Sequence, residues 1–293
     1  MRNNKKQILI IGKNSYVGNS FKKYIESTHN DENWQVDLVG ASDGEWESYS
    51  FAEYDVIVHA AAIVHQKESK AREEIYRTVN YEMPLELANK AKKAGVTQFI
   101  FLSTMAVYGN VHGKITENTK VEPCTYYGKY KRLAEIDLLS KITDRFRVAI
   151  VRPPMVYGKD CNGNFARLMK LSKYCSIFPK IENKRSMIYI DNLSEYLYLI
   201  IKQEDSGIGC PQNLELVETA DLFCQMRNLQ NKKTIMTQRG NRFFLFLMKR
   251  IKAFQKMFGD SYYDISKEEV GWFSIYENEY QVVSYEESIK KCL

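Results

Sequence analysis

The sequence has few of the features that mark a disulfide scaffold, a metal site or a membrane protein. Its six cysteines form no C-x-x-C pair and have no paired histidine spacing, which argues against zinc and indicates reduced cytosolic thiols. No apolar run approaches ~18 residues, so we expect no transmembrane segment. The basic start, Met1 to Lys6, lacks the apolar length of a signal peptide. We therefore expect a cytoplasmic protein that binds no metal ion.

A large excess of one charge is also missing. The chain has 42 basic and 36 acidic residues and a net charge of +6, with the two signs interleaved along most of its length. This balance predicts mild attraction for anionic ligands such as phosphates, and no nucleic-acid partner. The basic, amphipathic stretch 242–256 allows two interpretations. A solvated helix face is the favoured one, and contact with an anionic membrane surface is the alternative.

What the sequence does contain is a regular alternation of apolar runs and helix-like stretches. Such alternation predicts βαβ units, and therefore an α/β fold with a Rossmann-like, doubly wound parallel sheet. Beyond residue 158 the pattern loosens into a small C-terminal α+β lobe. The predicted strands cover 7–11, 35–39, 55–58, 98–102 and 146–151, and the predicted helices cover 16–27, 70–94 with a kink or break at Pro84, and 127–141.

The turn from Gly12 to Gly18 directly follows the first predicted strand and opens a helix. In this position backbone N–H groups and a helix N-terminus can hold a pyrophosphate. Gly12 allows the tight turn and Gly18 lets the helix pack close to the strand. Ser15 stands where a third glycine is usual, and its hydroxyl can bond a phosphate oxygen. A plain strand-to-helix turn is the alternative. The remaining loop candidates are Asn14, Tyr16 and Val17.

Further candidates for a dinucleotide site follow the second and third predicted strands. Ser42 and Asp43 lie where an acidic residue would hold the adenosine ribose, but no Asp or Arg stands directly at the strand end. The choice between NAD and NADP therefore stays open. His59, Ala60 and Ala61 end the third strand with mostly small side chains, and Asn80 precedes a helical run. Taken alone, these residues are more often structural than chemical.

The most informative pair is Tyr127 and Lys131. Taken alone, this spacing is more often that of a solvated helix face, and its weight comes from the neighbouring motifs. On a helix this spacing places both side chains on one face, where the ammonium can lower the pKa of the phenol. The phenol could then exchange a proton with a sugar or alcohol hydroxyl near neutral pH. Ser103 and Thr104 end the preceding strand, at the sheet edge where open α/β folds bind ligands. We expect Thr104 to orient the same substrate oxygen.

In this order and spacing, these motifs resemble the extended short-chain dehydrogenase/reductase superfamily, within its NAD-dependent epimerase/dehydratase family. The resemblance runs from Gln7 to about Ile201 and is greatest to the UDP-glucose 4-epimerase-like subgroup. It implies a catalytic triad of Thr104, Tyr127 and Lys131 with bound NAD, or alternatively NADP. It also implies a UDP-sugar substrate and a homodimer.

The resemblance further assigns positions around the substrate. Arg185 matches the residue that commonly meets the substrate diphosphate, and Pro154 falls within the cofactor motif. Met155 stands where typical galactose epimerases have an Asn. Met105 and Ala106 replace the Asp-Glu pair of the sugar dehydratases, so dehydration lacks its acid and base. The expected substrate contacts are Thr104, Met105, Tyr127, Met155, Asn164 and Arg185.

Three functions stay open at this point. The favoured one is an NAD(P)-dependent epimerase that acts at C4 of a UDP-sugar through a transient 4-keto intermediate, in surface polysaccharide biosynthesis. The first alternative is an NAD(P)H-dependent 4-keto reductase of a UDP-deoxy-aminosugar, and the remote one is a non-catalytic dinucleotide-binding protein. We expect residues 1–155 to form the NAD(P)-binding domain, joined by a strand from the C-terminal half, and residues 156–293 to form the substrate-binding lobe.

Overall fold

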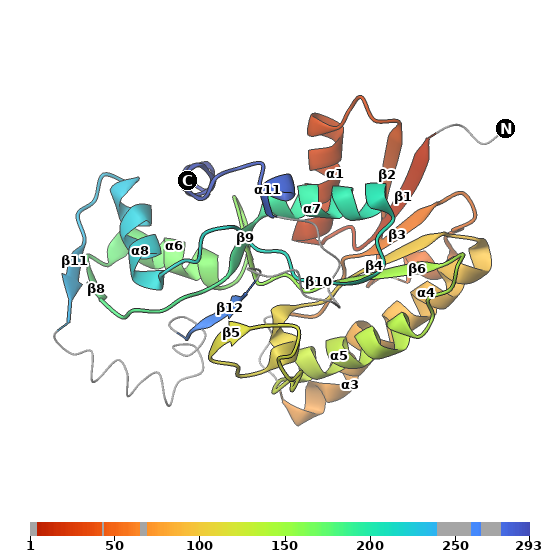
Figure 1. The fold of residues 1–293 in the computed structure, drawn as a ribbon, viewed down its shortest axis with the longest axis horizontal. Coiled ribbons are helices and arrows are strands. Elements are labelled where there is room, and N and C mark those ends of the chain that lie inside the picture. The colour runs from red at the N-terminus through yellow and green to blue at the C-terminus, as the bar shows by residue number, and fades with distance from the viewer. Residues whose placement is uncertain (1–4, 43, 65–68, 239–258, 265–276) are drawn as a thin grey trace.

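The computed structural model describes residues 5–42, 44–64, 69–238, 259–264 and 277–293. Its centre is a six-stranded sheet in the order β10-β6-β4-β3-β1-β2 (Figure 1). Every neighbouring pair is parallel, which confirms the predicted Rossmann-like, doubly wound sheet. The strands are β1 (Lys6–Ile11), β2 (Trp34–Val39), β3 (Val56–His59), β4 (Gln98–Leu102), β6 (Arg147–Val151) and β10 (Gly207–Gly209).

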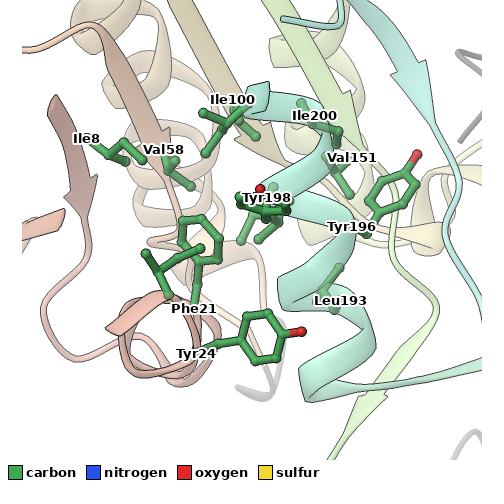
Figure 2. Packing of buried hydrophobic residues seen from close by; sticks show 14 of the residues in the cluster. Ile8, Phe21, Tyr24, Val58, Ile100, Val151, Leu193, Tyr196, Tyr198 and Ile200 are labelled. Carbon is green, nitrogen blue, oxygen red and sulfur yellow. The ribbon is translucent and has the colours of Figure 1, made fainter. Parts of the chain in front are cut away.

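Helices α1 (Tyr16–Thr28) and α7 (Ile190–Gln203), with the short α11 (Glu277–Tyr280), cover one face of the sheet (Figure 1). Alternate residues of a strand point to opposite faces, so Ile8 faces these helices. Figure 2 shows Ile8 and Val58 of the sheet beside Phe21 of α1, with Leu193 of α7 in the same cluster. The sequence did not lead us to expect α7, which returns from the C-terminal half to close this face.

The opposite face is covered by α4 (Met83–Ala94), α5 (Tyr126–Leu139) and the short α2 (Glu45–Ser48). Leu9 and Ile11, the alternate residues of β1, pack in this cluster with Leu87 of α4 and Ala134 of α5. The two apolar layers bury both sides of the sheet, as continuous apolar strands require. This packing fixes α5, and with it Tyr127, relative to the strand ends.

The predicted helix 70–94 is four consecutive helical pieces. They are η1 (Lys70–Arg72), α3 (Glu73–Arg77), the π-helical turn η2 (Thr78–Glu82) and α4. Pro84 lies in the first turn of α4, where its missing N–H removes no bond within that helix. The departure from regular helix is therefore the π turn just before Pro84, and Asn80 lies inside that turn.

A second cluster of elements forms the lobe at the other end of the molecule (Figure 1). Its core includes Phe178, which stacks on Phe223 with ring centroids 3.9 Å apart. Because α7 and β10 return to the central sheet, the division at residue 155 stays a prediction. The remaining elements are η3 (Met105–Tyr108), β5 (Gly113–Ile115), β7 (Met155–Tyr157), α6 (Asn164–Tyr174), β8 (Ile177–Pro179), β9 (Met187–Tyr189), α8 (Thr219–Asn228), β11 (Ile235–Thr237), β12 (Ser261–Tyr263) and α12 (Tyr285–Lys291).

Two of the sequence-based predictions fall outside the described residues. They are Asp43 and the basic stretch 242–256. Among the helices that the structure describes, none has both the length and the apolar character needed to span a bilayer.

Candidate active site

A cleft of about 1540 Å³ opens where the carboxyl ends of the parallel strands meet the lobe. On the sheet side it is lined by the residues that follow β1, β3, β4 and β6, the edge where open α/β sheets bind ligands. On the lobe side it is lined by Asn164, Arg185 and Ser261. Pockets for one small ligand usually measure roughly 300–1,000 Å³. This cleft therefore has room for a dinucleotide and a second ligand.

The turn after β1 is built for a close approach of backbone to ligand. Gly12 has φ +129, and a Cβ there would lie 3.0 Å from the backbone N of Ala61. Ser15 is the N-cap of α1, and its Oγ accepts a bond from Gly18 N at 3.2 Å. A Cβ on Gly18 would lie 2.9 Å from Cγ2 of Ile10. Both glycines therefore have the steric roles expected of them, and the cradle fits a pyrophosphate.

The cofactor candidates fall into two groups. Most of them line the cleft, and the others lie behind its wall. The lining candidates are Gly12, Asn14, Ser15, Tyr16, Val17, Ser42, Ala60, Ala61, Ser103, Tyr127 and Pro154. Gly18, His59, Asn80 and Lys131 do not line it.

His59 and Asn80 support the cleft wall from behind. His59 is fully buried and stacks on Phe101 with ring centroids 5.7 Å apart. Burial, followed by the nearby Lys131, lowers the pKa of His59 well below its usual value, so the ring is neutral. Asn80 is also buried, and its Oδ1 accepts a bond from the backbone N of Ile63 at 3.1 Å. It thus fixes the loop that follows Ala62.

The sequence analysis missed an acidic group at the end of β2. Glu45 lies on α2, but its Oε2 accepts bonds from Gly40 N at 2.9 Å and from the Lys13 ammonium at 3.1 Å. The carboxylate thereby occupies the strand end, where dinucleotide-binding folds place the acid that holds the ribose. The only sequence signal for it was an acidic residue six positions beyond the strand, which is too remote to single out.

The three triad candidates come together beside this cradle. Thr104 and Tyr127 share a side-chain hydrogen bond and both line the cleft. Thr125 caps α5 by accepting a bond from Gly128 N at 3.1 Å. Because a Cβ on Gly128 would lie 2.6 Å from the Ala106 carbonyl oxygen, only glycine lets α5 pack this close to η3. The Thr125 cap and the close contact at Gly128 therefore fix the position of Tyr127 relative to Thr104.

Lys131 lies one turn from Tyr127 but points into the protein. It is fully buried, donates to the Leu102 carbonyl oxygen at 2.7 Å, and lies 4.2 Å from the centroid of the Phe101 ring. Burial lowers its pKa to about 7, and Glu135 opposes this shift. Burial raises the pKa of Tyr127 to about 12, and the bond from Thr104 opposes that shift. Burial is the largest cause at both groups, so the pKa of Tyr127 lies above its ordinary value, whereas the sequence led us to expect a lowered one.

A buried ion pair lies beneath the triad. Arg152, at the end of β6, donates from Nε to Glu135 Oε1 at 2.9 Å and from Nη2 to Oε2 at 2.7 Å. Ser103 donates to the same Oε1 at 2.5 Å. The other Arg152 nitrogen donates to the Tyr108 hydroxyl at 2.8 Å. Bidentate geometry fixes orientation as well as distance, so this pair joins β4, α5, β6 and η3 under the reactive groups.

The substrate candidates complete the lobe side of the cleft. Met105, Met155, Asn164 and Arg185 all line it, together with Thr104 and Tyr127. Arg185 is held by backbone bonds to Val217, and burial lowers its pKa to about 10, so it remains a cation at neutral pH. A cation and the amide of Asn164 beside the triad suit an anionic ligand.

Comparison with curated proteins gives two informative relatives. The chain is 37% identical over 155 residues to a UDP-glucose 4-epimerase of Vibrio cholerae, a match that covers 50% of this chain and 47% of the relative. It is 26% identical to an N-acetyl-alpha-D-glucosaminyl-diphospho-ditrans,octacis-undecaprenol 4-epimerase of Escherichia coli O157:H7, over 68% of this chain and 64% of the relative. The matches thus span about half to two thirds of the relatives' length.

The fold and the family profile agree with these relatives. A UDP-glucuronic acid 4-epimerase of Bacillus cereus, solved in complex with NAD, is 16% identical and superimposes with a TM-score of 0.73. That match covers 98% of this chain and 95% of the other. Residues 8–211 match the profile of the NAD dependent epimerase/dehydratase family. The resemblance drawn from the sequence is therefore confirmed.

Proposed function

Because this chain belongs to the NAD dependent epimerase/dehydratase family, we propose that it inverts C4 of a UDP-sugar by using a bound dinucleotide. The observation that carries the proposal is the Thr104–Tyr127 hydroxyl pair, which faces a large cleft beside a glycine cradle. The two relatives named above are, by name, 4-epimerases of a sugar carried on a diphosphate. Their shared chemistry supports the C4 position and the diphosphate.

The residues present fit the expected cofactor. The Gly12 turn leaves no room for a side chain, small residues follow β3, and the Glu45 carboxylate lies at the end of β2. These features would hold the pyrophosphate and the adenosine ribose of NAD. A dinucleotide held there would supply the hydride acceptor and donor for oxidation and reduction at C4. We favour NAD over NADP because a carboxylate at the ribose repels a 2′-phosphate.

The side chains of the triad would remove and return the proton of the sugar 4-hydroxyl. Tyr127 takes the proton of the 4-hydroxyl as the sugar is oxidised to a 4-keto intermediate, and returns it when hydride comes back to the other face. Thr104 orients the same oxygen through the bond that it shares with Tyr127. With a pKa of about 12, Tyr127 needs a nearby positive charge to act as a base, and Lys131 is the candidate on the same helix. Arg185 would pair with the diphosphate.

One observation favours the reductase alternative. A phenol that holds its proton at neutral pH is ready to protonate a carbonyl oxygen, which is the step that a 4-keto reductase of a UDP-deoxy-aminosugar requires. The raised pKa of Tyr127 thus suits reduction without further help. A non-catalytic role is disfavoured because Thr104, Tyr127 and Lys131 are all present. The place of either reaction would be polysaccharide biosynthesis.

The experiment that separates these functions incubates purified protein with UDP-glucose or UDP-N-acetylglucosamine and, in a separate arm, with a UDP-4-keto-sugar and NAD(P)H, and resolves the products by NMR. Inversion at C4 without net cofactor consumption supports the epimerase. Consumption of NAD(P)H with a UDP-4-keto-sugar, without inversion of the two test substrates, supports the reductase instead. A 4-keto-6-deoxy product would contradict both.

Tyr127→Phe serves as the matched variant in this experiment, because it removes the hydroxyl and keeps the ring. We expect it to lower turnover by about 10²–10⁴-fold. Tyr130→Phe is the control on the same helix, since the Tyr130 hydroxyl donates to Glu73 at 2.9 Å and not toward Thr104. Near-normal turnover in Tyr127→Phe would reject Tyr127 as the acid–base group.

A further inference from the structure

The tip of the lobe exposes large apolar side chains that are not part of the cleft. On α6, Leu171 and Tyr174 are three residues apart, so they lie on one helix face, with exposed fractions of 39% and 81%. Ile177 of β8 and Ile235 of β11 are register partners in parallel strands, with exposed fractions of 55% and 61%. We call these four residues the tip patch. Figure 1 places α6, β8 and β11 at the end of the molecule.

The segments that carry the tip patch are held together by a buried arginine. Arg227 of α8 donates from Nη1 to the Ser172 carbonyl oxygen at 2.8 Å and from Nη2 to the Lys233 carbonyl oxygen at 2.7 Å. The Lys232 ammonium donates to the Lys173 carbonyl oxygen at 2.8 Å, at the end of α6. The patch is therefore a fixed surface that joins the end of α6 to the strand pair.

Positive charge surrounds the tip patch. Residues 164–180 and 228–238 contain six basic residues and no Asp or Glu. The nearest acidic residues along the chain are Asp160, Glu182 and, on α8, Asp221. All six basic side chains are exposed, and they are Arg167, Lys170, Lys173, Lys180, Lys232 and Lys233.

From this combination we propose that the tip patch docks the protein onto an anionic lipid bilayer. An exposed tyrosine and branched aliphatic side chains suit the interfacial layer, and the surrounding lysines match the charge of anionic headgroups. Exposed apolar side chains in fixed register are unfavourable in water unless a partner covers them. A partner protein with a basic surface would be repelled by these six basic side chains.

The docking geometry leaves the cleft accessible. Helix α6 begins at Asn164, which lines the cleft, and ends at Tyr174 in the tip patch. A helix of this length spans roughly 15 Å. The cleft would therefore lie about one helix length from the bilayer surface, with the chemistry of the triad unaffected by docking.

The test is flotation of the full chain with vesicles of phosphatidylcholine alone or mixed with phosphatidylglycerol. We expect binding to the mixed vesicles only, and weaker binding at high salt because the charges are exposed. Tyr174→Ser/Ile235→Ser and Lys232→Glu/Lys233→Glu should each lower the partition coefficient by about tenfold or more. Turnover of a free nucleotide sugar should stay unchanged in both.

Two control variants change the same kinds of residue elsewhere. Ile142→Ser/Val282→Ser removes exposed apolar side chains, and Lys23→Glu/Lys70→Glu reverses two exposed charges. Both controls should float like the unchanged protein. The proposal falls if the unchanged protein does not float with the anionic vesicles, or if the tip variants float as well as the controls. It also falls if the tip variants only change the oligomeric mass, because a second copy would then be the occupant.

Discussion

At the scale of single residues, the ionisation of Lys131 stands out because its buried ammonium bonds to a carbonyl oxygen and faces an aromatic ring. Its ammonium donates to the Leu102 carbonyl oxygen and faces the Phe101 ring, with the neutral His59 nearby. Glu135, one turn further along α5, favours the charged form but is itself engaged by Arg152. The balance leaves the pKa of Lys131 at about 7.

This pKa gives a stability prediction for Lys131→Met in dinucleotide-free protein. In the unfolded chain the lysine pKa is near ~10.4, above its folded value of about 7. Below pH ~7 both states are charged and the folded state bears the full cost of burying the charge, whereas above ~10.4 both are neutral and that cost vanishes. Lys131→Met should therefore stabilise the protein most at low pH, by roughly 2–4 kcal/mol, and less as pH rises.

Denaturant unfolding at several pH values checks this prediction. The hydrogen bond to Leu102 is lost in the variant at every pH, so the slope with pH reports mainly on the charge. Lys129→Met is the control, because the Lys129 ammonium pairs with Glu73 at the surface. Its stability difference from the unchanged protein should not show the same dependence on pH. A stability difference that is flat with pH would show that Lys131 has an ordinary pKa.

Glu45 gives a second prediction at this scale, on cofactor choice. Its carboxylate lies at the end of β2 and accepts from Gly40 N and the Lys13 ammonium. Glu45→Gln removes the negative charge that would repel a 2′-phosphate. We expect the ratio of NAD to NADP affinity to fall by about tenfold or more, measured by calorimetry. Glu47→Gln, on the same helix and at a residue that lines the cleft, is the control and should leave the ratio near its original value, because no bond from Glu47 to the end of β2 is seen among the described residues.

The contrast between Glu45 and the triad shows which residues a sequence reveals. Tyr127 and Lys131 belong to one helix, and Thr104 directly follows a strand, so local spacing was enough to find them. Glu45 reaches the strand end only because α2 turns back toward it, and no spacing rule encodes that return. Likewise His59 ends a strand as expected, yet the sequence could not show that its ring lies in the core and not in the cleft.

At the scale of elements, the ion pair Arg152–Glu135 decides how α5 lies against the strand ends. Arg152 follows β6, Glu135 is on α5, and Ser103 follows β4. Tyr263 of β12 also donates to the Arg152 carbonyl oxygen at 2.8 Å. A shift of this pair would therefore move Tyr127 and Lys131 relative to both the sheet and the lobe.

Breaking this pair tests its positioning role. Glu135→Gln leaves the buried guanidinium without its countercharge, which should cost about 3–5 kcal/mol of folding stability. If the pair positions α5, kcat should fall by about tenfold or more while KM for the nucleotide sugar changes little. The double variant Glu135→Gln/Arg152→Met removes both charges, and should recover stability but not kcat.

Ser288→Ala is the matched control, because it removes a buried hydroxyl bonded to Tyr157 in the lobe, away from the triad. It should lower stability by about 1 kcal/mol without lowering kcat. Full kcat in a folded Glu135 variant would mean that the pair only stabilises the fold.

Helices and strands could be predicted from the sequence where a short run of residues carried the whole pattern. The boundaries of β4 agreed with the sequence, and those of β1 and α1 agreed to within one residue, because buried strands read as unbroken apolar runs. The π turn Thr78–Glu82 was not foreseen, since no residue pattern distinguishes it from regular helix. A kink or break was expected at Pro84, which lies just after this turn, because proline lacks an N–H. Helix α7 is amphipathic, so its spacing carried a helical signal that the sequence analysis did not use.

At the scale of the whole molecule, α3 and α5 carry a second apolar surface among the residues that the structure describes. On α5, Leu133 and Ile136 are three residues apart and have exposed fractions of 38% and 48%, and Ile75 of the neighbouring α3 is 46% exposed. Figure 1 shows α3 and α5 side by side, on the face of the sheet opposite α1 and α7. This surface is separate from the tip patch, so the two can be tested independently.

We predict that a second copy of the chain covers the α3–α5 surface, which would make the protein the homodimer expected from its sequence. Ile136→Glu places a charge among the three apolar side chains, and burying it between two copies would be strongly unfavourable. The unchanged protein should have the mass of a dimer in light scattering, and Ile136→Glu should lower that mass by about half at micromolar concentration. Ile142→Glu, beyond the end of α5, is the control and should remain dimeric. Because association stabilises the folded state, the monomeric variant should also be less stable toward heat at equal concentration. A chain that is monomeric before any substitution would contradict the dimer and leave the apolar surface of α5 without this explanation.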